Sequence, residues 1–261
     1  MRADYHVHTA FCDGSASPGE MAEAALRQGL ASLGFSGHSH TSFDESWCMS
    51  PEGTEAYRRE VLGLKERYAG RLEILCGLER DLFSDAPAEG WDYVIGSVHY
   101  VPAGEDYLPV DESPEHLRAG AEKHFGGDLY AFAEAYFAQV SRVPEIPGCT
   151  VIGHFDLIAK FCEREPLFDE TDPRYAAAWR KAADALLGSG LPFEINTGAI
   201  ARGYRSVPYP APPILRYLAE RGARFLLSGD CHSPETLCYG FDRWEKEARA
   251  LGCELIASPK G

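Results

Sequence analysis

The feature that most constrains the fold of this chain is a series of short apolar segments that end in a histidine or a carboxylate. The first segment, residues 4–9, carries His6 and His8 on either side of Val7. Side chains on a strand alternate between its two faces, so both imidazoles point the same way. Two imidazoles on a rigid backbone are half of a metal site. A lone pair of this kind also fits two hydrogen-bonded histidines at a strand end, so the rest of the chain has to decide.

The same pattern recurs along the chain. Seven of the nine histidines lie at or just past the end of a predicted strand, and carboxylates take similar positions on three strands. The other two, His116 and His124, lie in polar helical surroundings, which favours a solvated face. Such regular placement favours one shared functional site. The strand-end residues are His6, His8, His38, His40, His99, His154 and His232, with Glu79, Glu194 and Asp230.

The predicted strands alternate with helices, which is the order of a parallel sheet. Polar residues at the carboxyl ends of the strands are typical of a barrel mouth. A length of 261 residues with 45% hydrophobic residues suits one such domain. We therefore expect an α/β fold, a distorted TIM-like (β/α)7 barrel that forms a single domain over residues 1–261. Strands are expected at 4–9, 31–36, 73–79, 93–99, 150–154, 192–196 and 224–228, with a short further strand at 254–257; residues 100–112 and 197–213 are expected to be loops.

Charge and cysteine content narrow the class of protein. Acidic residues outnumber basic ones by 40 to 25, giving a formal charge of −15 that repels nucleic acid and anionic membranes. The eight cysteines are scattered without a CxxC pair, which fits a reducing cytoplasm. The first strand begins close to Met1 and no apolar run reaches membrane-spanning length, so we expect neither a secretory signal nor a membrane anchor.

Six motifs occupy the strand ends: His6-Val7-His8, Ser36-Gly37-His38, Gly77-Leu78-Glu79, Ser97-Val98-His99, Gly153-His154-Phe155-Asp156 and Gly229-Asp230-Cys231-His232. In this order they resemble the polymerase and histidinol phosphatase (PHP) family of metal-dependent phosphoesterases. Residues 44–46 and 198–204 resemble its histidinol-phosphatase branch. Family members commonly have Thr-Asp-His or Thr-Glu-His where this chain has Ser36-Gly37-His38, a departure that loses a carboxylate but keeps the histidine.

The resemblance implies three divalent transition-metal ions, Zn, Mn or Fe, at the barrel mouth. Mixed imidazole and carboxylate ligands suit these ions, and carboxylates bridge metals readily. Glu79 would bridge the first and second ions, and Glu79, Asp230 and His232 are the predicted catalytic residues. The implied ligands are His6, His8, Glu79 and Asp230 for the first ion, Glu79, His99 and His154 for the second, and Asp13, His38 and His232 for the third.

The implied reaction is hydrolysis of L-histidinol phosphate to L-histidinol and phosphate, a step of histidine biosynthesis. Clustered metals supply an activated water and neutralise the phosphoryl oxygens. The phosphate still needs cationic side chains, for which Arg202 is favoured over Lys160 and Arg205. His40 could be a metal ligand, a hydrogen-bond donor to the phosphate, or a partner that orients a ligand. Of these roles, contact with the substrate is favoured over metal ligation. The alternatives are a phosphoesterase for another small phosphate or a nucleotide, and a non-catalytic metal-binding module.

Overall fold

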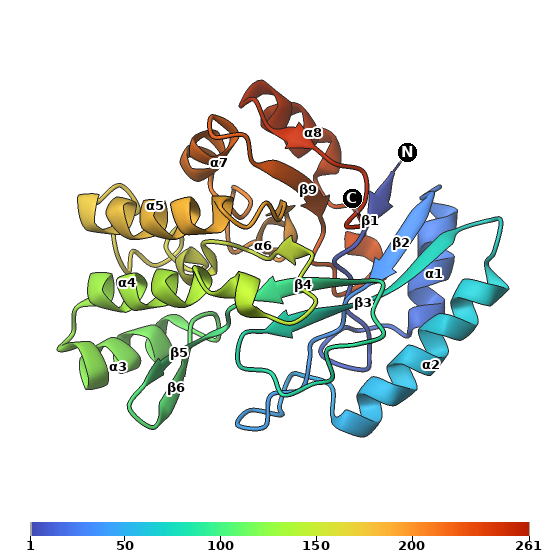
Figure 1. The fold of residues 1–261 in the computed structure, drawn as a ribbon, viewed down its shortest axis with the longest axis horizontal. Coiled ribbons are helices and arrows are strands. Elements are labelled where there is room, and N and C mark those ends of the chain that lie inside the picture. The colour runs from blue at the N-terminus through green and yellow to red at the C-terminus, as the bar shows by residue number, and fades with distance from the viewer. Residues whose placement is uncertain (1, 261) are drawn as a thin grey trace.

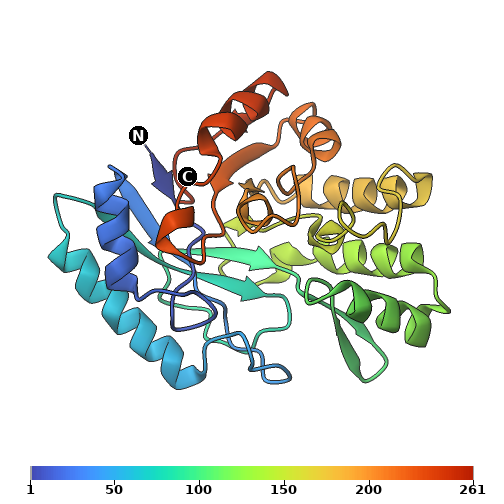
Figure 2. The ribbon, with the colours of Figure 1, turned by 180° about the vertical axis from the view of Figure 1, so that it is seen from behind.

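The computed structural model describes residues 2–260. Its centre is a curled sheet of eight strands, paired in parallel throughout, with the helices on its outer side (Figures 1 and 2). The predicted TIM-like α/β barrel is confirmed. In sheet order the strands are β1 (Ala3–Asp4), β2 (Ser32–Phe35), β3 (Glu73–Asp81), β4 (Tyr93–Ser97), β7 (Val151–Ile152), β8 (Phe193–Asn196), β9 (Arg224–Ser228) and β10 (Glu254–Leu255).

Several helices begin at a proline that follows a capping side chain. A serine or aspartate oxygen accepts a backbone N–H of the first turn, and proline loses nothing at the first helical position. Ser17, Ser50, Ser113 and Asp172 are such caps. None of the helices in residues 2–260 is both long and apolar enough to cross a membrane. The helices are α1 (Pro18–Arg27), α2 (Pro51–Arg67), α3 (Pro114–Phe125), α4 (Leu129–Val140), α5 (Pro173–Leu187), α6 (Gly198–Ala201), α7 (Pro212–Ala219) and α8 (Phe241–Ala250), with 3-10 turns at Val143–Glu145, Leu157–Ala159 and Pro234–Thr236.

The two faces of each strand have different partners. On β3, Ile74, Cys76 and Leu78 pack in the outer core beneath the helices, whereas Leu75 packs inside the barrel. The period of two therefore places Glu79 on the inner face, four residues beyond Leu75. The same alternation turns polar side chains of β4, β8 and β9 inward. Apolar side chains fill the barrel below this polar layer: Tyr5, Leu75, Tyr93, Ile95, Val151 and Leu226.

The barrel closes at its mouth through the backbone beyond β1 and β9. Val7 and Cys231 form a parallel bridge: the N–H of His8 donates to the Cys231 carbonyl at 2.8 Å, and the N–H of Cys231 donates to the His6 carbonyl at 2.9 Å. The segment with His6 and His8 thus lies beside the segment with Asp230 and His232, although more than two hundred residues separate them in sequence.

Three predicted segments differ from the structure: the first strand, the expected loop 100–112, and the expected loop 197–213, which contains the short helix α6 (Gly198–Ala201). The ladder of β1 ends at Asp4 rather than Thr9. Beyond it, the N–H of Val7 donates to the Ser36 hydroxyl at 3.0 Å instead of to a backbone carbonyl of the neighbouring strand, while the Val7 carbonyl still accepts the N–H of Ser36 at 2.9 Å. The expected loop 100–112 contains a hairpin, β5 (Tyr100–Ala103) and β6 (Asp106–Pro109). Its two-residue turn begins at Gly104 with φ of +63°, a conformation that glycine adopts without strain.

Candidate metal centre

Glu79 lies at the centre of the barrel mouth, and its side chain is fully buried. Its Oε1 accepts a hydrogen bond from Ser97 Oγ at 2.7 Å. Its two oxygens face different groups of histidines, as a bridging carboxylate would. Oε2 lies 3.2 Å from His6 Nε2, 3.4 Å from His8 Nε2 and 2.8 Å from His38 Nδ1, while Oε1 lies 2.8 Å from His154 Nε2 and 3.5 Å from His99 Nε2.

The two carboxylate oxygens of Asp230 also face different partners. Its Oδ1 lies 3.2 Å from His8 Nε2 and 3.7 Å from His6 Nε2, whereas Oδ2 accepts a hydrogen bond from Arg202 Nη2 at 3.0 Å. Its backbone has φ of +47°, which is strained for a residue with a side chain. Such strain persists where the surroundings fix the residue, and it is concentrated at functional sites.

Gly198, at the start of α6, makes room for Asp230. A Cβ added to Gly198 would lie 2.7 Å from the Cβ of Asp230, closer than real Cβ contacts. We expect Gly198→Ala to lower the free energy of unfolding by about 1–3 kcal/mol and to weaken metal binding, because Asp230 has to shift. Gly63→Ala is the matched control: Gly63 lies in α2, where an added Cβ would meet nothing within 4 Å, and alanine there should stabilise by about 0.4–1 kcal/mol. Denaturant unfolding compares the two, and equal effects would contradict the close-approach argument.

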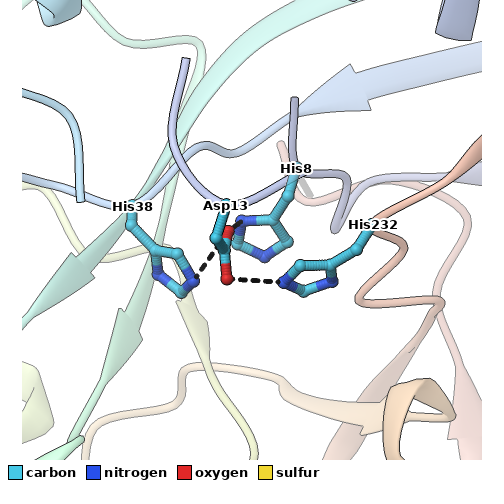
Figure 3. Close-up of side chains that lie close together, drawn as sticks. All are labelled: His8, Asp13, His38 and His232. Atoms are coloured by element: carbon cyan, nitrogen blue, oxygen red, sulfur yellow. Dashed lines mark hydrogen bonds and ion pairs between the residues drawn. The ribbon is translucent and has the colours of Figure 1, made fainter. Parts of the chain in front are cut away.

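A third group of possible metal ligands, three histidines, surrounds Asp13 in the loop after β1 (Figure 3). Asp13 Oδ2 lies 3.1 Å from His232 Nε2, and Oδ1 lies 3.6 Å from His38 Nε2 and 3.7 Å from His8 Nδ1. His38 therefore presents one nitrogen to Asp13 and the other to Glu79. The structure brings all nine predicted ligands together, but His8 and His38 each face two groups, so the assignment of ligands to individual ions stays a prediction.

The donor set fits divalent cations. Four atoms at the centre are buried and make no hydrogen bond of acceptable geometry in the described residues, although His38 Nδ1 and Glu79 Oε2 lie only 2.8 Å apart: His6 Nε2, His8 Nε2, His38 Nδ1 and Glu79 Oε2. Such orphaned atoms are rare in proteins and are expected where an ion binds. Ligands of a tetrahedral ion at about 2.0–2.2 Å lie roughly 3.2–3.6 Å from one another, and several contacts between these donors have this length.

The protonation states suit ligation at two central positions. Burial, together with the neighbouring His232 and His38, lowers the pKa of His8 to about 3, so its imidazole is neutral as a ligand must be. Burial by itself would raise the pKa of Glu79, but the adjacent His38 and His6 outweigh it and hold that pKa well below its ordinary value. Burial by itself would lower the pKa values of His6 and His38, but the neighbouring carboxylates outweigh it and raise both. These two rings therefore have to release a proton when a cation binds.

Further carboxylates orient the histidines from behind. Glu194, one of the strand-end carboxylates, has its Oε2 2.8 Å from His6 Nδ1, where it can orient the ring of this predicted ligand. Asp81 was not predicted: its Oδ2 accepts the backbone N–H of His99 at 2.9 Å and lies 3.2 Å from the Nδ1 of that ring. The signal that could have found Asp81 is the period of two, since it follows Glu79 on the inner face of β3.

The cationic side chains predicted to bind phosphate lie in different surroundings. Arg202 reaches the site, where Nη1 donates to the Asp230 carbonyl at 3.0 Å and lies 2.8 Å from His232 Nδ1. Lys160 pairs with Asp111 at 3.2 Å. The surroundings of Arg205 argue against its predicted role in phosphate binding. Its side chain is 2% exposed, and its Nη groups donate to the Ala159 carbonyl and to Glu170.

His40 is also held away from the cluster. Its Nδ1 lies 2.6 Å from Asp85 Oδ1 and its Nε2 lies 3.0 Å from Glu45 Oε1. With both ring nitrogens engaged by carboxylates, His40 links two loops, and these contacts leave neither nitrogen for the substrate contact that we predicted.

Comparison with known proteins identifies the family. The profile of the PHP domain matches residues 4–198. A Deinococcus radiodurans protein named "Probable histidinol-phosphatase" is 35% identical, over 97% of this chain and 95% of its own length. The "Histidinol-phosphatase" of Bacillus subtilis is 24% identical, over 93% of this chain and 97% of its own length.

Two solved structures share the fold. HisK of Listeria monocytogenes has a TM-score of 0.82 at 19% identity, covering 93% of this chain and 100% of its own. Histidinol phosphate phosphatase of Lactococcus lactis, solved with Zn, L-histidinol and phosphate, has a TM-score of 0.75 at 18% identity, covering 98% of this chain and 96% of its own. With the family profile matching most of the chain and a relative above 30% identity over nearly its full length, this chain belongs to the PHP domain family.

Proposed function

We propose that this chain is a histidinol-phosphate phosphatase that hydrolyses L-histidinol phosphate to L-histidinol and phosphate in histidine biosynthesis. The observation that carries the proposal is the buried cluster around Glu79, whose orphaned donor atoms call for cations. Relatives named histidinol-phosphatase match almost the whole chain, which supports L-histidinol phosphate as the substrate. We further propose that residues 1–261 form one metallophosphatase domain, and that it works in the cytoplasm, as the eight free cysteines favour.

The proposed centre holds three divalent ions, Zn, Mn or Fe, on the nine residues that meet at the mouth. When bound, such ions lower the pKa of water and neutralise the phosphoryl oxygens. Glu79 and Asp230 hold negative charge at the centre, and Glu194 and Asp81 fix the rings of His6 and His99. The nearby thiol of Cys231 is a poor nucleophile, because burial raises its pKa to about 12. The chain therefore contributes binding, orientation and charge.

Arg202 is the proposed phosphate anchor. We expect Arg202→Ala to lower kcat/KM for L-histidinol phosphate roughly thirtyfold to a thousandfold, since losing a charged hydrogen-bond partner costs on the order of 2–4 kcal/mol. Its metal content should stay near that of the wild type, because guanidinium is no ligand. Steady-state kinetics with parallel metal analysis measures both.

Arg202 also pairs with Asp230, so a control has to separate the two roles. Arg202→Lys keeps the charge beside Asp230 but loses the planar pair of donors, and it should recover only part of the rate. A loss below about threefold for Arg202→Ala would assign its guanidinium to the Asp230 pair alone and leave Lys160 as the remaining candidate for the phosphate anchor.

A panel of phosphate monoesters tests the proposed function. The metal-loaded protein should hydrolyse L-histidinol phosphate with a higher kcat/KM than glycerol phosphate, sugar phosphates, phosphotyrosine or a nucleoside monophosphate. A clear preference for another member of the panel would replace the substrate and leave the reaction class in place. If protein with full metal content hydrolyses no member of the panel, the proposed enzyme function is wrong and the alternative of a non-catalytic metal-binding module is favoured.

A further inference from the structure

A pocket of about 420 Å³ opens directly beside the candidate metal ligands His38 and His99. Its size is within the range of small-molecule sites. His38 and His99, two of the predicted ligands, line this space together with Asp13, so the pocket adjoins the candidate metal centre. The second wall of the pocket comes from the 41–50 loop, the β5–β6 hairpin and the residues that directly follow the hairpin, none of which supplies a predicted ligand. This second wall consists mainly of Asp44, Ser46, Trp47, Tyr100, Asp111 and Glu112.

Trp47 supplies a flat aromatic surface close to the cluster. The centroid of its ring lies 4.4 Å from that of His38 and 5.1 Å from that of His99. Its indole N–H donates to Tyr100 Oη at 2.7 Å, which fixes the orientation of the ring. An oriented indole can pack against a planar ring or against a cation.

Asp44 supplies a negative charge that its own partners leave uncancelled. The Tyr100 hydroxyl donates to Oδ2 at 2.7 Å, and the Ser46 hydroxyl donates to Oδ1 at 2.7 Å. Both donors are neutral, so they orient the carboxylate without neutralising it. The other two acids of this wall differ, since Asp111 pairs with Lys160 and Glu112 lies 3.6 Å from His116 Nε2.

The 41–50 loop is held in place independently of any ligand. Phe43 stacks on Tyr107 of β6 with centroids 4.0 Å apart and planes 7° apart. The hydroxyl of Thr41 donates to the Asp44 carbonyl at 2.9 Å. Asp44 and Trp47 are therefore preorganised, and binding does not have to order them.

We infer that Asp44 and Trp47 form a subsite that selects phosphate monoesters with a cationic, planar organic end, while the candidate metal ligands take the phosphate. Asp44 is the counter-ion of the ammonium group of the substrate, and Trp47 packs against the planar ring of the substrate. The inference rests on the proposed function and deepens it, because L-histidinol phosphate carries both an ammonium group and an imidazole.

Four substrates and two variants separate the roles of charge and ring. The substrates are L-histidinol phosphate, phosphoethanolamine with a cation only, p-nitrophenyl phosphate with a ring only, and glycerol phosphate with neither. Asp44→Asn should lower kcat/KM for the two cationic substrates roughly ten- to a hundredfold, and change the other two less than about twofold. Trp47→Leu should lower kcat/KM for the two ring-bearing substrates about fivefold or more. Asp106→Asn, the same change at an exposed ion pair of the hairpin, is the matched control and should alter none of them.

The outcomes distinguish this subsite from the proposed function. The subsite is overturned if Asp44→Asn, with unchanged metal content, lowers kcat/KM equally for all four substrates or for none of them. This holds even where the wild type prefers L-histidinol phosphate. If the wild type does not hydrolyse L-histidinol phosphate but Asp44→Asn selectively impairs phosphoethanolamine, the function fails and the charge-selective part of the subsite stands.

Discussion

Replacing Glu79 with glutamine is expected to lower kcat/KM for L-histidinol phosphate roughly a thousandfold or more and to reduce the metal content of the protein. The reason is the central position of this carboxylate. Oε2 faces His6, His8 and His38, while Oε1 faces His99 and His154. A neutral amide therefore weakens the charge available to two groups of ligands at once.

The comparison variant is His154→Asn, which removes a side chain that approaches only Oε1. Its losses in rate and in metal should be smaller than those of Glu79→Gln. Glu66→Gln, the same chemical change on the exposed face of α2, controls for the substitution itself. Metal analysis and steady-state kinetics on the three proteins decide the question. Full metal content and a near-normal rate in Glu79→Gln would show that this carboxylate does not bridge.

Removal of metal is the second change with a very large expected effect. Dialysis against a strong chelator should lower phosphate release roughly a thousandfold or more, and added Mn, Fe or Zn should restore it. The side chains at the site can orient a substrate, but the imidazoles and carboxylates meet around atoms without partners rather than around a protein nucleophile.

Circular dichroism before and after dialysis controls for unfolding. The barrel interior is closed by apolar side chains below the site, so the fold should survive the loss of metal. Unchanged turnover by protein whose metal content is verified as negligible would rule out a metal-dependent reaction.

Much of the fold and most of the candidate site could be predicted because both follow from local patterns. The position of Glu79 inside the barrel follows from the alternation along β3, and the meeting of strand ends follows from the parallel order. Segments whose structure depends on a turn were harder. The β5–β6 hairpin has strands of only four residues, which contain Pro102 and Pro109, and its tight turn shows in the conformation of Gly104.

The contacts of long cationic side chains could not be predicted from the chain order. Arg202 and Arg205 lie three residues apart in one loop, yet one reaches Asp230 at the site and the other is buried against Glu170. Which acid each one meets depends on how distant segments pack. The placement of Trp47 and Asp44 beside the site was missed for the same reason, since both hydrogen-bond to Tyr100 of the distant β5–β6 hairpin.

The most direct test of the central claim is an anomalous-scattering experiment on crystals of metal-loaded protein. The account predicts strong peaks at the barrel mouth, within coordination distance of Glu79 and of nitrogen atoms of His6 and His8, with three ions shared among the nine residues. Fully loaded crystals whose anomalous peaks all lie away from Glu79, with His6 and His8 contacting no ion, would contradict it.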